Sequence, residues 1–77
     1  MKLVINNLNE IGPHLRQIRL AKKISMRAMV EKTNGISATT IAKVETGNNY
    51  PSLGTLTEWL KALGYDEITI RFGGSPE

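Results

Sequence analysis

The chain has 77 residues, enough for one small domain. It has no cysteine, which excludes disulfides, thiolate metal sites and cysteine nucleophiles, and its net charge is +3. No apolar run approaches the ~20 residues that a membrane span needs, and the start does not resemble a secretory signal. We therefore expect a soluble, cytoplasmic protein.

The positive charge is concentrated in one part of the chain. Seven of the ten Lys and Arg residues lie between His14 and Lys43, where Glu31 is the single acidic residue. The remaining residues carry more acidic than basic groups. This asymmetry indicates either a face that binds a polyanion or a solvated basic surface without a partner, and charge alone leaves both interpretations open.

The first predicted elements are a short extended run and a helix. Leu3-Val4-Ile5 is typical of a tail or a short strand. Gly12-Pro13 indicates the start of a helix, because proline fits the first helical turn. The helix carries an apolar stripe at helical spacing, formed by Ile11, Leu15 and Ile18.

Two further helices are predicted on either side of a turn. Ser25 can cap the first of them, which runs to about residue 33. Asn34-Gly35 indicates a turn, because both residues tolerate a positive φ. Ser37 can cap the second, a short helix ending near residue 46. Its inward residues would be Ile41 and Val44.

A fourth helix is predicted between Ser52, a cap, and Gly64, a terminator. Its apolar face is broad and consists of Leu53, Leu56, Trp59, Leu60 and Leu63.

After this helix the pattern alternates, which predicts a half-buried strand. Its apolar residues, which we assign to dimerisation, are Ile68, Ile70 and Phe72. A lone strand cannot satisfy its backbone groups. Its partner is therefore Leu3–Ile5, the same strand of a second chain, or another protein, and we favour the second chain.

The helices on either side of Asn34-Gly35 match the helix-turn-helix plan, in which the second helix lies in the major groove of DNA. Threonine can touch the thymine methyl group, and Lys43 can reach guanine or a phosphate. The outward residues of that second helix are small or polar, namely Ala38, Thr39, Ala42, Lys43 and Thr46.

The stretch Thr40–Leu53 is similar to the "t-I-s-r-i-E-n-G-…-P-s-l" signature of the Cro/lambda-repressor-like helix-turn-helix family, also called the XRE family. The likeness extends from about Ile11 to Tyr65. It implies an all-α bundle of four to five short helices, with a C-terminal strand that pairs in a dimer. The DNA-binding domain would span 11–65, between a tail or strand at 1–10, a dimerisation strand at 66–72 and a flexible tail at 73–77.

The resemblance also implies roles for single residues. Arg19 and Glu45 match an arginine and a glutamate that pair across the fold, and both would be structural. The implied DNA-binding residues are Arg27, Ser37, Ala38, Thr39, Ala42, Lys43, Asn48, Asn49 and Tyr50. Three departures from the pattern are Met26 for the usual glutamine, Val30 for a small alanine, and a turn at 34–37 that is one residue longer.

We therefore expect a transcriptional regulator from a bacterium or phage, a repressor that binds double-stranded DNA as a homodimer on a palindromic operator. The alternative is an antitoxin that binds a toxin protein and represses its own operon. The acidic residues are scattered and offer no metal-binding cluster, so we expect no enzyme activity, cofactor or metal. His14, the single histidine, would be a surface or cap residue.

Overall fold

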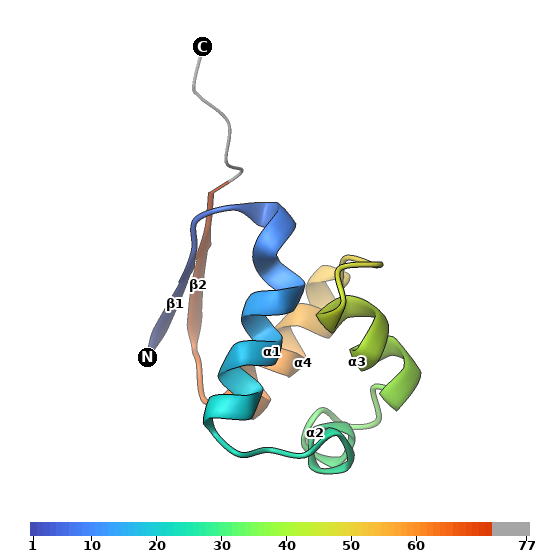
Figure 1. Cartoon of the computed structure of the whole chain (residues 1–77). Helices are drawn as coiled ribbons and strands as arrows, with labels where there is room; N and C mark the ends of the chain where they lie inside the picture. Colours follow the sequence, from blue (N-terminus) through green and yellow to red (C-terminus); the bar gives the residue numbers. More distant parts are fainter. Residues whose placement is uncertain (72–77) are drawn as a thin grey trace.

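The computed structural model describes residues 1–71, in which two short strands lie beside a bundle of helices (Figure 1). The elements are β1 (Lys2–Ile5), the 3₁₀ turn η1 (Leu8–Glu10), α1 (Ile11–Ala21), α2 (Met26–Lys32), α3 (Ala38–Glu45), α4 (Leu53–Leu63) and β2 (Glu67–Ile70). This arrangement confirms the predicted helical bundle with a C-terminal strand. Within the described residues, every helix is too short or too polar to cross a membrane.

Serine side chains set the starts of α2, α3 and α4, as predicted. The hydroxyls of Ser25, Ser37 and Ser52 each accept a hydrogen bond of 3.1 Å from the N–H group three residues later. These bonds satisfy N–H groups that have no partner within the helix. At the other end of α4, Gly64 adopts a left-handed conformation with φ of 91°, which terminates the helix.

The turn between α2 and α3 also has the predicted conformation. Asn34 and Gly35 have φ values of 58° and 98°, in the left-handed region that these residue types favour. The side-chain amide of Asn34 donates to a carboxylate oxygen of Glu58 at 3.2 Å. This bond ties the turn to α4.

The core lies between the helices and the inner face of the sheet. Its buried apolar residues are Leu3, Ile5, Ile11, Leu15, Met29, Ile41, Val44, Leu56, Trp59, Leu60 and Leu63. The predicted apolar face of α4 is correct except at Leu53, which is 84% exposed. Leu53 is the first residue of α4, at an end of the helix that the described residues leave uncovered.

The sheet corrects one prediction about β2. We favoured a second chain as its partner, but β2 pairs with β1 of the same chain, in parallel, from Lys2 opposite Glu67 to Ile5 opposite Ile70. Parallel neighbours need a long crossover, which the four helices supply. Phe72, assigned to the same strand, lies outside the described residues.

Helices α1 and α3 meet backbone to backbone at Gly12. This residue is buried, and a β-carbon placed on it would overlap the carbonyl oxygen of Val44. That oxygen belongs to the backbone of α3, so it cannot rotate away as a side-chain atom could. The absence of a side chain at position 12 therefore sets how closely α3 packs on α1.

We predict that Gly12→Ala destabilises the protein by about 2–3 kcal/mol, the usual cost of overpacking. Gly54→Ala is the matched control, because a β-carbon at Gly54 in α4 meets no atom within 4 Å. It should be neutral or stabilising by up to about 1 kcal/mol. Urea unfolding followed by circular dichroism measures both changes, and equal effects would contradict the packing argument.

Candidate nucleic-acid interface

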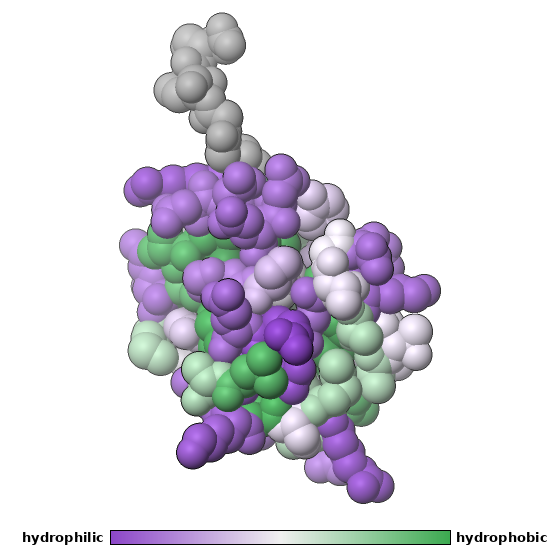
Figure 2. All heavy atoms as spheres, viewed as in Figure 1, coloured by the Kyte–Doolittle hydropathy of each residue, from purple (hydrophilic) through white to green (hydrophobic). Residues whose placement is uncertain are grey.

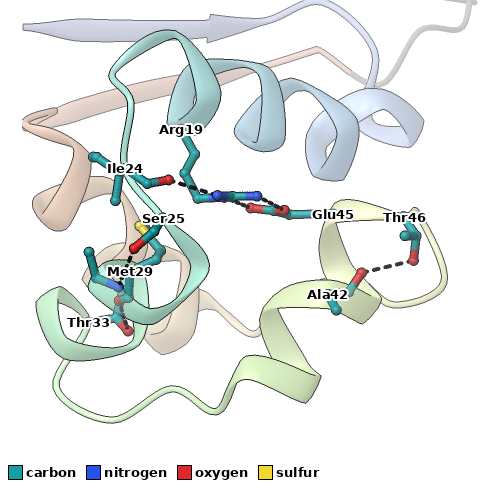
Figure 3. A network of polar contacts seen from close by, with 9 residues as sticks. Arg19, Ile24, Ser25, Met29, Thr33, Ala42, Glu45 and Thr46 are labelled. Atoms are coloured by element: carbon teal, nitrogen blue, oxygen red, sulfur yellow. Dashed lines mark hydrogen bonds and ion pairs between the residues drawn. The ribbon is translucent and has the colours of Figure 1, made fainter.

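A buried ion pair holds α3 against the rest of the bundle (Figure 3). The Nε of Arg19, in the last turn of α1, lies 2.7 Å from Oε2 of Glu45, and its Nη2 lies 3.0 Å from Oε1. The remaining guanidinium nitrogen, Nη1, donates to the carbonyl oxygen of Ile24 at 2.8 Å. One side chain therefore connects α1, the loop before α2, and the end of α3.

The opposite charges of Arg19 and Glu45 stabilise each other in this buried site. Glu45 is the last residue of α3, where a carboxylate meets the negative end of the helix dipole. Its side chain is 2% exposed and that of Arg19 is 8% exposed, so each charge depends on the other for compensation. The hydrogen-bonded carboxylate raises the pKa of Arg19 above its ordinary value, although burial acts in the opposite direction. The guanidinium is therefore charged at any physiological pH.

Helix α3 has one buried side and one open side. Ile41, Val44 and Glu45 face the core. In Figure 2 the surface over α3 is mostly pale, as expected for alanines and threonines. The sequence-predicted residues in and beside this helix are all exposed, namely Ser37, Ala38, Thr39, Ala42 and Lys43.

The hydroxyl groups along this open side are not equally available. Ser37 donates to the Thr40 hydroxyl at 2.9 Å while it caps the helix. Thr46 donates to the carbonyl oxygen of Ala42 at 2.9 Å (Figure 3). Within residues 1–71, the side chains of Thr39 and Lys43 make no hydrogen bond or ion pair. These two side chains therefore have free donors on the open face.

The loop after α3 is ordered by its own hydrogen bonds. The N–H groups of Asn48 and Asn49 both donate to the carbonyl oxygen of Lys43, at 2.9 and 3.3 Å. The hydroxyl of Tyr50 donates to Oδ1 of Asn9 in η1 at 2.6 Å. A phosphate oxygen only accepts hydrogen bonds, so to bind the Tyr50 hydroxyl it would have to replace Asn9 as the acceptor. Sequence reasoning left Tyr50 between a packing role and a phosphate contact and did not anticipate Asn9.

Helix α2 carries the remaining predicted contact. Arg27 is exposed near its N-terminal end. The neighbouring Met26, which stands where the family pattern has glutamine, is half-buried and packs against the core. The first position of α2 therefore contributes to packing. His14 is partly buried in α1, and no three His, Asp or Glu residues gather into a metal site within residues 1–71.

Two features that position this surface were not predicted from the sequence. The Ile24 carbonyl that accepts from Arg19 lies outside any helix, and backbone acceptors carry no residue-type signal. The packing role of Gly12 was also missed, because glycine near a helix start has several local explanations. For Gly12 the signal is the close approach of the Val44 backbone, which lies far away along the chain. For Ile24, only five residues from Arg19, it is the direction in which a backbone carbonyl points.

Comparison with known protein families gives one match. A helix-turn-helix family model covers residues 15–70. The chain belongs to the Cro/lambda-repressor-like helix-turn-helix family. It is thus a DNA-binding transcription regulator. Searches of curated proteins and of solved structures found no significant match.

We predict that removing one member of the buried pair, by Arg19→Met, destabilises the protein by about 3–5 kcal/mol, because it leaves an uncompensated buried carboxylate. Arg19→Met with Glu45→Leu removes both charges and should recover most of that loss. Thermal and urea unfolding of wild type and the two variants measures the difference. If the double variant is no more stable than the single one, the penalty does not come from the isolated charge.

Proposed function

We propose that this regulator is a repressor that binds a palindromic operator as a homodimer, with α3 as the recognition helix in the major groove. The observation that carries the proposal is the availability of Thr39 and Lys43. Both lie on the open side of α3 and keep free donors, whereas Ser37 and Thr46 use their protons within the chain. In this proposal Thr39 and Lys43 read bases, and Ala38 and Ala42, each next to one of them in the sequence, permit close approach to the groove.

The segments flanking the recognition helix are assigned to the DNA backbone. Asn48, Asn49 and Tyr50 follow α3 and are exposed, as is Arg27 in α2. The Tyr50 hydroxyl would exchange its acceptor Asn9 for a phosphate oxygen. Amide, hydroxyl and guanidinium groups are the usual donors to phosphate oxygens. Contacts of this kind orient the protein on the duplex without selecting a sequence.

The exposed face of a single α3 helix is small, so it can contact few base pairs. In a homodimer two such faces would contact the operator together. Two recognition helices related by a twofold axis would lie about one DNA turn (~34 Å) apart and would read inverted half-sites. No contact among residues 1–71 favours a toxin-binding surface, so the homodimeric repressor is the proposal and the antitoxin stays the alternative. A toxin reading frame beside the gene would support that alternative.

We predict that Thr39→Ala with Lys43→Ala lowers the preference for operator over random DNA by at least about 30-fold, at ~1 kcal/mol for each lost base contact. Selection from a random DNA pool defines the operator, and competition binding measures the preference. The matched control is Thr57→Ala with Lys61→Ala, which removes the same residue types at the same spacing from the exposed surface of α4. Equal selectivity of both double variants would contradict the assigned role of α3.

We also predict a steep dependence of affinity on salt. If each protomer of the dimer contributes about two cationic phosphate contacts, Arg27 among them, raising the salt from about 50 to about 200 mM should weaken operator binding ~10²-fold. Arg27→Ala removes one cation from each protomer and should make the slope of log affinity against log salt shallower by about two units. Fluorescence anisotropy over a salt series measures both, and an unchanged slope would remove Arg27 from the interface.

A further inference from the structure

The turn between α2 and α3 contains a chemically reactive pair of residues. Asn34 is the only asparagine in the sequence that is followed by glycine. The backbone nitrogen of a glycine can attack the side-chain amide of a preceding asparagine, because the glycine has no β-carbon to obstruct the approach. Both residues of the pair are exposed, so water reaches them. A residue with a side chain follows every other asparagine, including Asn48 and Asn49.

Two hydrogen bonds occupy the reacting groups in the folded turn. The N–H group of Gly35 donates to the carbonyl oxygen of Val30 at 3.2 Å, and Asn34 has a φ of 58°. This is the Schellman geometry that ends a helix, here α2. The side-chain amide of Asn34 donates to Oε2 of Glu58 at 3.2 Å. The attacking nitrogen and the leaving amide are therefore both engaged, and the turn must open before they can react.

Opening this turn disturbs little of the core. Both hydrogen bonds are at the long end of the usual N–H···O range, and Asn34 and Gly35 lie at the surface. Segments with exposed hydrogen bonds and few buried contacts open at lower free energy than the core. The reaction is therefore controlled by these two bonds, one within α2 and one to α4.

The reaction consumes one water molecule and releases one ammonia, without oxidation or reduction. The backbone nitrogen of Gly35 forms a bond to Cγ of Asn34, the Cγ–Nδ2 bond breaks, and the proton of the glycine nitrogen leaves with the ammonia. Water then opens the five-membered imide at one of its two carbonyl carbons. One product has aspartate at position 34. In the other, isoaspartate, the main chain passes through the side-chain carbon and is one atom longer.

Either product removes the bond between the turn and α4. A carboxylate at position 34 has no proton to donate to Glu58, and the two negative charges repel each other. The isoaspartate product also lengthens the backbone between α2 and α3. Ile36, two residues further on, is half-buried and packs against the core. A displaced turn therefore changes how α3 is held at its start.

We propose that Asn34-Gly35 is a modification site, at which deamidation releases the turn from α4 and lowers the affinity for DNA, and that Glu58 restrains the reaction. The chemical step depends on the turn alone. Its effect on binding rests on the proposed function, in which α3 must enter the major groove in one orientation. Because the ammonia is lost, the modified fraction grows with the time that the chain spends with this turn open.

Incubation of the full chain in neutral buffer, followed by peptide mapping with mass spectrometry, tests the site and its restraint. Asn34 should convert to a mixture of aspartate and isoaspartate, while the exposed Asn48 stays unmodified. Glu58→Ala should speed the conversion about 5-fold, the effect of losing one hydrogen bond. The control is Lys61→Ala, an exposed position three residues further along α4, which should stay within about twofold of wild type. Circular dichroism confirms that each variant is folded.

Aged protein tests the effect on binding. Wild type incubated until Asn34 has converted should bind operator about 10-fold more weakly than fresh protein, the cost of about one base contact. Asn34→Gly is the matched control, because glycine tolerates the positive φ and cannot undergo the reaction. Its affinity should be unchanged by the same incubation.

Two further variants test the release from α4. Asn34→Asp reproduces one product without ageing and should lower operator affinity about 5-fold. Adding Glu58→Gln replaces the repelling carboxylate with an amide that can donate to the new carboxylate. The double variant should therefore bind within about twofold of wild type.

The proposal is overturned if Asn34 stays as unmodified as Asn48, or if Glu58→Ala and Lys61→Ala change the rate equally. Conversion without loss of affinity, or equal loss in aged wild type and aged Asn34→Gly, also overturns it. Failure of the proposed function has a different signature. If no sequence is enriched from the random DNA pool, the repressor proposal fails, while the mass spectra still decide whether Asn34 is modified and whether Glu58 restrains it.

Discussion

The guanidinium of Arg19 fixes α3 from behind, through two hydrogen bonds to Glu45 and a third to the carbonyl oxygen of Ile24. A planar group with forked donors defines direction as well as distance, so it constrains the orientation of α3 as well as its position. The cost of burying two charges is offset by this full set of partners. Hydrophobic contacts alone would hold α3 less specifically, because they do not depend on direction.

The polar side chains of α3 fall into two groups: some make hydrogen bonds within the chain, and others stay available on the surface. The Ser37 hydroxyl accepts from the Thr40 N–H at the start of α3, where helix N–H groups lack partners, and at its end the Thr46 hydroxyl is a second donor to the Ala42 carbonyl oxygen, beside the Thr46 N–H. Thr39 and Lys43 lie between them and remain available. Hydrogen bonding at the ends of this short helix uses different residues from those that carry free donors. The helix can therefore present donors to a ligand without losing the bonds at its ends.

Much of this structure follows from local sequence. The serine caps, the Asn34-Gly35 turn and the glycine after α4 act over a few residues, so a single sequence identifies them. The Arg19–Glu45 pair came from family resemblance, because nothing local connects residues so far apart. The partner of β2 was chosen wrongly, since its alternation shows that a strand exists but not what lies beside it.

Some features of the candidate interface could likewise be predicted from local sequence, and others could not. The open face of α3 follows from helical periodicity, which gives the exposure of Thr39 and Lys43. The hydrogen bond from Tyr50 to Asn9 joins positions 41 residues apart and depends on how η1 meets the loop after α3. Leu53 illustrates the limit of periodicity, which assigns a residue to a face but does not say how far the core extends along the helix.

The pairing of β1 with β2 also affects the order in which the chain folds. Their residues lie 65 positions apart, as Lys2 and Glu67 do, and closing so long a segment costs roughly 4 kcal/mol of chain entropy in an unfolded chain. The helices, whose hydrogen bonds are local, meet no such cost and can assemble first. We therefore expect the sheet to close last, after the helices have packed, and Leu3 and Ile5 to complete the core only then.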